Sequence, residues 1–207
     1  MSAPKPVNPD TAAVNPALPN PAVLEFLLTR RSRPARTLAL PVPDRAKLTQ
    51  ILTAAARTPD HGKLEPWRFI VLTRPALERL GTLARTRGAE GGLRDEKLAK
   101  AVSQYSDSHL AVAVVNVPRP TDKIPHFEQL LSTGAVCLSL LNATLAAGFG
   151  ANWLTGWLSQ DPQFCAEGLG LLPGERVAGL IHIGTETITP PERPRPDLEA
   201  ITTWIDA

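Results

Sequence analysis

The sequence predicts a β-sheet that carries helices on both of its faces. Two runs, Leu110–Val117 and Val177–Ile183, are apolar almost throughout, which is typical of strands covered on both sides. Segments with the 3.6-residue apolar period of amphipathic helices separate the candidate strands. Because 43% of the 207 residues are hydrophobic, the chain can bury one substantial core.

The first two helices are indicated by their starts and by their apolar spacing. Asn20 followed by Pro21 is typical of a helix N-terminus, because the side chain can cap the helix and proline lacks only an N–H that would stay unpaired. A second helix is expected to start near Asp44 and to end before Pro59, which disfavours helical geometry in the residue preceding it. The basic, proline-marked segment 30–43 is expected to be a loop.

Trp67–Thr73 is rich in aromatic and β-branched residues and is the first predicted strand. The segment Gly148–Trp157 is glycine-punctuated and is expected to be partly extended. The remaining predicted elements are helices at Pro75–Arg87, Arg94–Gln104, Pro125 to about Ala147, and Pro162–Gly168.

Composition limits the partners and the domain organisation. The chain has 22 basic and 20 acidic side chains, and this even balance argues against nucleic acid as the main partner. Residues 1–19 are rich in proline, show no apolar period and are expected to form a flexible tail without the features of a signal peptide. We expect residues 20–207 to form a single domain with a C-terminal extension.

Neither cysteine spacing nor hydropathy indicates a metal site or a membrane span. Cys137 and Cys165 lack a C-x-x-C spacing, so both are expected to be buried thiols in a reducing cytoplasm. The apolar stretch from Leu130 to Leu145 is short for a bilayer and is interrupted by polar residues. We expect it to form a buried helix.

Several common catalytic motifs are missing from the sequence. It contains no G-x-G-x-x-G, no G-x-x-x-x-G-K-[ST], no H-E-x-x-H and no G-x-S-x-G. A Rossmann dehydrogenase, a P-loop enzyme and a serine hydrolase are therefore disfavoured.

A set of short motifs occurs in one order along the chain. They are Arg30-Arg31-Ser32, Arg57-Thr-Pro-Asp-His61, Glu65-Pro-Trp-Arg-Phe69, Gly148-Phe-Gly-Ala-Asn-Trp-Leu-Thr-Gly156 and Gly184-Thr185. This ordered set, over residues 22–186, resembles the FMN-dependent nitroreductase family, most closely its compact bacterial YdjA-like branch.

The resemblance implies an α+β fold of the nitroreductase type, a sandwich in which a central mixed sheet is flanked by helices. It implies an intertwined homodimer with two FMN sites at the subunit interface. The implied activity is a ping-pong reaction in which NAD(P)H reduces FMN, and a nitroaromatic, a quinone or a similar electron-poor acceptor is then reduced in the same cleft.

The resemblance also implies roles for individual residues. Arg30, Arg31 and Ser32 would bind the FMN phosphate and ribityl chain, and Arg57 and His61 would reach the flavin from the other subunit. The residues expected along the flavin ring are Trp153, Leu154 and Thr155. The residues expected to contact NAD(P)H are Ala143, Thr144, Leu145, Ala146, Ala147 and Gly148.

These residue types suit the chemistry of a bound flavin. Arginine binds a phosphate through two parallel N–H bonds, and Ser32 adds a small hydroxyl. A fixed cation near the N1–O2 edge of the flavin favours its anionic reduced form, and Arg57 is the candidate for this role. No side chain need act as a nucleophile, because the flavin N5 carries the hydride.

Each interpretation has a structural alternative. The arginines of the first loop could form a solvated basic surface or a nucleic-acid patch. Trp153 could be a core residue, Trp157 is expected to be one, and His182 within an apolar strand is expected to be a hydrogen-bonded structural histidine. The whole chain could also be a flavin-binding protein with a specialised dehydrogenase or flavin-holding role, or a basic interaction protein without a cofactor.

One residue departs from the family pattern. Glu65 stands where the family usually has glutamine before Pro-Trp. A carboxylate near the flavin would oppose its anionic reduced form, unless Lys63 or Arg68 pairs with the carboxylate. The sequence leaves open whether this change alters the reduction potential or has no effect.

Overall fold

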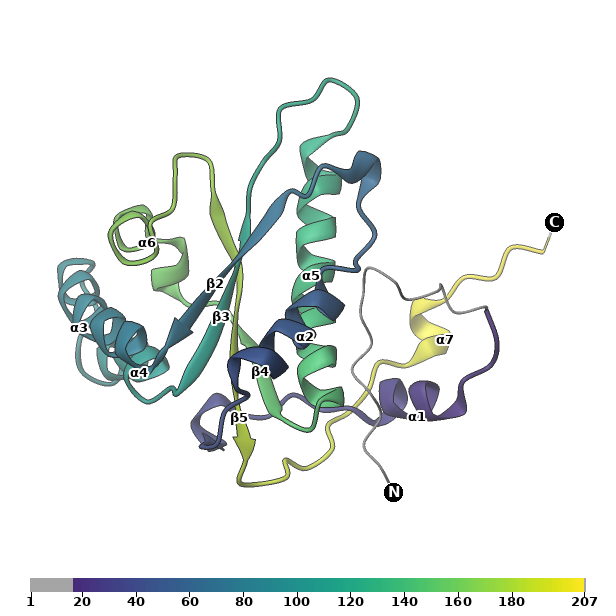
Figure 1. Ribbon diagram of the computed structural model, residues 1–207, viewed down its shortest axis with the longest axis horizontal. Coiled ribbons are helices and arrows are strands. Elements are labelled where there is room, and N and C mark those ends of the chain that lie inside the picture. Colours follow the sequence, from purple (N-terminus) through teal and green to yellow (C-terminus); the bar gives the residue numbers. More distant parts are fainter. Residues whose placement is uncertain (1–16, 207) are drawn as a thin grey trace.

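The computed structural model describes residues 17–206, so residues 1–16 of the tail predicted at residues 1–19 lie outside the described part. Figure 1 shows a central sheet with helices packed on both of its faces, as expected from the sequence. The strands are β1 (Leu38–Ala39), β2 (Trp67–Thr73), β3 (Leu110–Asn116), β4 (Gly150–Leu154) and β5 (Arg176–Glu186). The helices are α1 (Pro21–Thr29), α2 (Arg45–Ala55), α3 (Arg74–Glu90), α4 (Asp95–Ser106), α5 (His126–Ala146), α6 (Pro162–Leu169) and α7 (Leu198–Ile201).

The expectation of a mixed sheet is wrong for the described residues, because every strand pair in it is antiparallel. The strand order is β1-β5-β3-β2, and β4 pairs with β5 beside the short β1. The connection from β2 to β3 is the antiparallel helix pair α3–α4, which returns the chain to the end of the sheet where it left. A parallel neighbour would instead need a single crossover segment.

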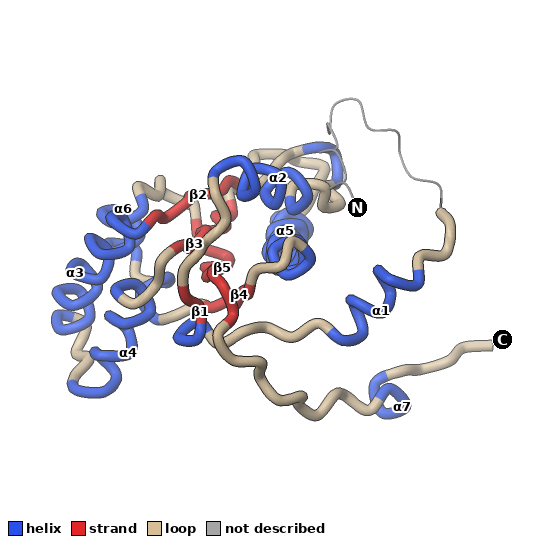
Figure 2. The backbone as a smooth tube through the Cα atoms, turned by 60° about the horizontal axis from the view of Figure 1, so that its bottom comes forward, coloured by secondary structure: helices blue, strands red, loops and turns tan. Residues whose placement is uncertain are grey.

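Two hydrophobic cores lie on the two faces of the sheet. Helices α2 and α5 cover one face, and α3, α4 and α6 cover the other, as Figure 2 shows. Strand β3 is buried along its whole length, because alternate side chains enter the two cores. The prediction of a strand covered on both faces is therefore confirmed.

Helix ends follow the capping residues that the sequence indicates. The side chain of Asn20 accepts a hydrogen bond from the backbone N–H of Val23, and Asp44 does the same for Lys47 at the start of α2. The segment predicted as a loop before α2 also contains a short 3-10 turn at Ala35–Thr37 and the two-residue strand β1.

Helix α5 is apolar on more than one side. Its buried face, which includes Val136 and Leu140, packs on the sheet. Phe127, Leu131 and Leu138 are exposed on the opposite face. Among the described residues, α5 is the one helix whose length and composition would suit a membrane span, but core helices have the same properties, and we interpret it as a core helix.

The two ends of the described chain contribute little to either core. Helices α1 and α7 have no buried residue and lie apart from the sheet (Figure 2). Their apolar side chains are exposed, and so is the segment after α7, in which the Trp204 side chain is 82% exposed. Cys137 and Cys165 are buried free thiols, which confirms their predicted state.

Candidate functional site

A cluster of arginines surrounds a cavity at the end of α1. Arg30 is the C-terminal cap of α1, so the end of this helix positions the Arg30-Arg31-Ser32 motif beside the cavity. Arg193 and Arg195 reach the same cavity from the C-terminal segment. The cavity has a volume of about 440 Å³. We call Arg30, Arg31, Arg33, Arg193 and Arg195 the arginine cluster.

The charge of Arg30 is not paired with a carboxylate among the described residues. Its Nε atom is buried and has no hydrogen-bond partner, while Nη2 donates to the Ser32 hydroxyl at 3.3 Å. Burial lowers the pKa of Arg30, and the neighbouring charges of Arg195, Arg31 and Arg33 lower it further. A buried N–H donor among several cations is suited to an anion with several oxygen acceptors, such as a phosphate.

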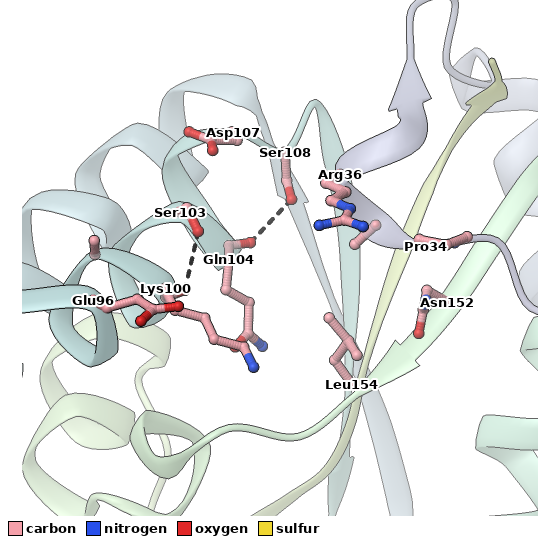
Figure 3. Close-up of a pocket in the computed structure, with 12 residues that line it drawn as sticks. Pro34, Arg36, Glu96, Lys100, Ser103, Gln104, Asp107, Ser108, Asn152 and Leu154 are labelled. Carbon is pink, nitrogen blue, oxygen red and sulfur yellow. Dashed lines mark hydrogen bonds between the residues drawn. The ribbon is translucent and has the colours of Figure 1, made fainter. Parts of the chain in front are cut away.

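A second, larger cavity of about 640 Å³ lies between α4 and the sheet (Figure 3). We call it the α4 cleft. Asn152 and Leu154 of β4 line it on the sheet side, together with Arg36 from the loop after the arginine motif. Lys100 and Gln104 line it from α4.

Gln104, which lines the α4 cleft, carries a hydrogen-bond donor that has no partner. Its Nε2 atom is buried without a partner. On the other side of the amide, a Cβ atom at position 156 would lie 2.7 Å from Oε1 of Gln104, so only glycine fits there without displacing Gln104. The cleft thus has a polar donor that a ligand could satisfy, beside a backbone without a side chain.

A buried polar pair lies next to the cleft. Ser108 lines the cleft, and its hydroxyl lies 2.7 Å from Nδ1 of His182, which is 1% exposed. Burial lowers the pKa of His182 to about 4, so this ring is neutral at physiological pH. The prediction of a hydrogen-bonded structural histidine is confirmed, although Nε2 of the ring has no partner.

Some of the residues that line the two cavities are close together in the sequence. Arg30, Arg31 and Ser32 line the first, and Pro34, Ala35 and Arg36 line the second. Six residues of extended chain span about 20 Å at most. This length is an upper limit on the separation of these two groups of lining residues, and the two cavities share no lining residue.

Of the residues expected along the flavin ring, Leu154 lines the α4 cleft. The Trp153 side chain points to the opposite face of β4, where it packs on the α5 core and its indole N–H donates to the carbonyl of Ala178. Thr155 is exposed and does not line the cleft. Because side chains alternate along a strand, Trp153 can face the cleft only through its backbone. Trp157, expected in the core, is 44% exposed and covers the turn at Gly91.

His61 lies far from the arginine cluster within one chain, whereas Arg57 lies beside the middle of α5, where its neighbour Thr58 donates to the Ser139 hydroxyl. His61 is exposed, and its Nδ1 lies 2.7 Å from a carboxylate oxygen of Glu128 in the first turn of α5. Leu145, at the other end of α5, lines a small cavity with Arg30. Seventeen residues of α-helix separate these two ends, which is about 25 Å. One chain alone therefore does not bring the two halves of the predicted site together.

The segment expected to contact NAD(P)H forms the last turn of α5 and the residues after it. Thr144 is fully buried, and its hydroxyl donates to the carbonyl of Leu140. Leu145 and Gly148 are the members that line the small cavity beside Arg30. Ala143, Leu145 and Ala147 pack against the core. Direct contact of this segment with NAD(P)H stays a prediction.

Glu65 lies in a loop with unusual backbone geometry. Lys63 and Glu65 both have positive φ, at 54° and 47°, which is uncommon for residues other than glycine. Arg119 holds this loop by donating to the Glu65 carbonyl. Arg68, one of the two proposed partners of the Glu65 carboxylate, is paired instead with Glu175.

Sequence reasoning missed several residues of the two cavities. Arg193 and Arg195 lie in a second proline-rich segment, residues 190–196, outside the recognised motifs. Only their basic charge could have pointed to them. Lys100 and Gln104 lie on the predicted α4 helix, where a polar residue normally indicates a solvated face.

Comparisons with known proteins agree with this fold and these motifs. The sequence profile described as the nitroreductase family matches residues 27–185. The chain belongs to the nitroreductase family. A protein of Haemophilus influenzae, provisionally assigned as an NAD(P)H nitroreductase, is 37% identical over 164 residues, which cover 78% of this chain and 87% of that protein. YdjA of Escherichia coli K12, with the same provisional assignment, is 32% identical over 162 residues, with the same coverage of both chains.

Solved structures show the same nitroreductase fold. A nitroreductase-like family protein from Bacillus cereus has a TM-score of 0.73 at 22% identity, covering 94% of this chain and 100% of that one. A nitroreductase with bound FMN from Bacteroides fragilis has a TM-score of 0.68 at 21% identity, covering 89% of this chain and 98% of that one. The α+β fold class expected from the sequence is thereby confirmed.

Proposed function

We propose that this nitroreductase-family protein is an FMN-dependent oxidoreductase that takes a hydride from NAD(P)H and reduces nitroaromatic, quinone or similar electron-poor acceptors. The observation that carries the proposal is the buried, unpaired Nε of Arg30 within the arginine cluster, close along the chain to the α4 cleft. A cofactor with a phosphate at one end and a flat ring at the other matches this pair of cavities.

The arginine cluster would hold the FMN phosphate. Arg30 offers an unpaired N–H, and Ser32 already accepts a hydrogen bond from Arg30, so its own proton is free to donate. Arg195 and Arg193 add positive charge from the opposite wall of the cavity. A phosphate would relieve the mutual repulsion of these arginines, which is an additional source of binding free energy.

The α4 cleft would hold the flavin ring. Bound there, FMN supplies the hydride-accepting and hydride-donating chemistry, for which the protein needs no nucleophile. Gln104 would donate its unpaired N–H to a polar edge of the ring, and Gly156 leaves space for Gln104 to keep that position. Lys100 and Arg36 line the cleft together with Glu96 and Asp107, so its own charges balance, and the cation expected beside the ring is Arg57 from the other subunit.

The rest of the cleft would admit NAD(P)H and the acceptor in turn. Leu154 and the aliphatic parts of the α4 side chains give it apolar surface, which suits planar aromatic acceptors. A single cleft shared by donor and acceptor requires that the first leaves before the second enters. This order is a ping-pong mechanism.

We further propose that the active unit is a homodimer with two shared flavin sites. The exposed apolar residues of α5, Phe127, Leu130, Leu131 and Leu138, recur at spacings of three, four and seven and form one strip along the helix. Gly134 lies in the middle of this strip, with open space where a side chain would be. A glycine there would let a second α5 approach closely.

An antiparallel crossing of two α5 helices would complete each site. A two-fold axis near the middle of α5 would bring the His61–Glu128 end of one chain toward the Leu145–Arg30 end of the other. The exposed apolar residues of α1, α7 and the segment around Trp204 would then be covered by the partner, which supports an intertwined arrangement.

The proposal can be tested by anaerobic reduction of the purified protein. The protein should bind FMN, show flavin absorbance in the visible range, and lose that absorbance rapidly when NADPH or NADH is added under argon. Adding a quinone should then restore it. A protein that binds FMN but is not bleached by either nucleotide would be a flavin-holding protein, and one that binds no flavin would contradict the proposal altogether.

A further inference from the structure

A carboxylate of the C-terminal segment lies within the arginine cluster. Oε1 of Glu192 is 2.8 Å from Nη2 of Arg195 and 3.7 Å from Nε of Arg31. The backbone N–H of Arg193 also donates to this oxygen, at 2.8 Å. These contacts, that backbone bond first among them, lower the pKa of Glu192, which is therefore ionised at neutral pH.

Two carboxylates form ion pairs with this cluster within the described part of the chain, and they differ in position. Glu186 pairs with Arg33, which lies outside the arginine cavity. Glu192 pairs with Arg31 and Arg195, which both line it. Its side chain is 59% exposed, so it can rotate into solvent without losing buried contacts.

We propose that Glu192 is a built-in counter-ion that competes with the FMN phosphate for Arg31 and Arg195 and so sets how tightly this protein retains its cofactor. The inference rests on the proposed FMN site. A phosphate monoester that binds in the cavity would compete for Nη2 of Arg195, with which Glu192 is paired at 2.8 Å, and for the charge of Arg31. A carboxylate left beside the phosphate would repel it, so Glu192 must turn outward when the cofactor binds.

The consequence is that FMN binds less tightly and exchanges more readily. Without the carboxylate, Nη2 of Arg195 would be free to donate to the phosphate, the charge of Arg31 would no longer be partly neutralised, and one like-charge repulsion would disappear. A unit charge about 4 Å away in a water-like medium changes affinity by about five- to tenfold. The effect should be confined to ligands that carry the phosphate, since Glu192 does not line the α4 cleft.

The test compares FMN and riboflavin binding to the flavin-free protein by fluorescence quenching. Glu192→Gln keeps the shape of the side chain and removes its charge. Glu167→Gln is the matched control, because it makes the same charge change at an exposed position on α6. We expect Glu192→Gln to bind FMN about five- to tenfold more tightly, with riboflavin unchanged and with both affinities unchanged in Glu167→Gln.

The outcomes separate this inference from the proposed function. If wild-type protein binds FMN and Glu192→Gln binds it equally or less tightly, the counter-ion proposal is wrong, and Glu192 instead holds the arginines in place. If Glu167→Gln tightens FMN binding as much, the effect is one of net charge and the proposal also fails. If wild-type protein binds neither flavin, the proposed function itself is contradicted.

Discussion

Arg30 is the residue on which the cofactor proposal depends most. Its guanidinium combines an unpaired buried Nε with three neighbouring arginine charges that lower its pKa. Such an arrangement is unfavourable in the free protein and becomes favourable when an anion binds. The other arginine of the motif, Arg31, is already engaged by the carbonyl of Pro191 and by Glu192.

Replacing Arg30 should therefore weaken binding of the phosphate. Arg30→Ala should lower FMN affinity roughly ten- to a hundredfold, the equivalent of about 1.5–3 kcal/mol for a charge-assisted hydrogen bond. Riboflavin lacks the phosphate, so its affinity should change much less. Titrations of both flavins measure the difference, and an equal loss for the two would refute the assignment of Arg30 to the phosphate.

His182 gives the fold a pH dependence that can be predicted with its sign. Its pKa is about 4 in the folded chain because burial disfavours the charged ring, against about 6.5 when unfolded. The unfolded chain thus binds more protons between these values, and stability is complete above about pH 6.5 and falls as the pH drops to about 4. The loss from this residue is about 3 kcal/mol.

A variant that cannot titrate should lose this dependence. His182→Gln should unfold in urea with a stability that changes little between pH 6.5 and 4.5, whereas wild-type stability falls steadily. Glu175 and Glu186 have lowered pKa values, so their contributions are lost at lower pH, below about 4.5. His126→Gln, at an exposed position, should retain the wild-type slope. Equal slopes in wild type and His182→Gln would contradict the interpretation.

At the scale of elements, the end of β4 and helix α4 define the width of the α4 cleft. Gly156 follows β4, and its backbone has φ −126° and ψ 173°, which any residue can adopt. Glycine is needed there for space alone, since a Cβ would lie 2.7 Å from the Gln104 amide.

Gly156→Ala should push Gln104 out of position and impair binding of the ring. FMN and riboflavin affinities should then fall together, by severalfold, which distinguishes this variant from Arg30→Ala. Thermal unfolding should show that the fold persists, because the Gln104 side chain can move toward the cleft. If FMN affinity falls while riboflavin affinity is unchanged, the ring does not lie against Gln104.

At the scale of the whole molecule, the predicted site residues are spread along α5. Arg30 is near one end and His61 is near the other, separated by about 25 Å of helix, and Arg57 lies beside the middle of α5. The exposed strip on α5 offers the surface through which a second chain could bring them together.

Two defective chains should therefore complement each other. Arg30→Ala and Arg57→Ala homodimers should each bind FMN poorly, because both of their sites are damaged. A heterodimer of the two, isolated after co-expression with different affinity tags, should regain one intact site, since both defects fall in the other. Titrated flavin should then reach about half of the wild-type stoichiometry. A monomer in sedimentation experiments that keeps one FMN per chain would disprove the shared site.

The elements of this protein are determined largely by local sequence. Apolar periodicity and capping residues locate α2, β2, α5 and β5 to within a few residues, because these signals act between positions close along the chain. The sheet direction is not local. The expected sheet is mixed, whereas the pairing of α3 with α4 makes β2 and β3, the strands that they connect, antiparallel.

The candidate site also has residues that the sequence predicted and residues that only the structure brought together. From the sequence by itself, the resemblance of the ordered motifs to the family predicted that Arg30, Arg31 and Ser32 bind a phosphate, and this stays a prediction. Only the tertiary structure added Arg193 and Arg195 from the far end of the chain and Gln104 from α4. Only the structure shows that the Trp153 side chain points away from the α4 cleft. Long-range packing and strand alternation decide which side chains share a cavity, and neither is encoded in the spacing of one motif.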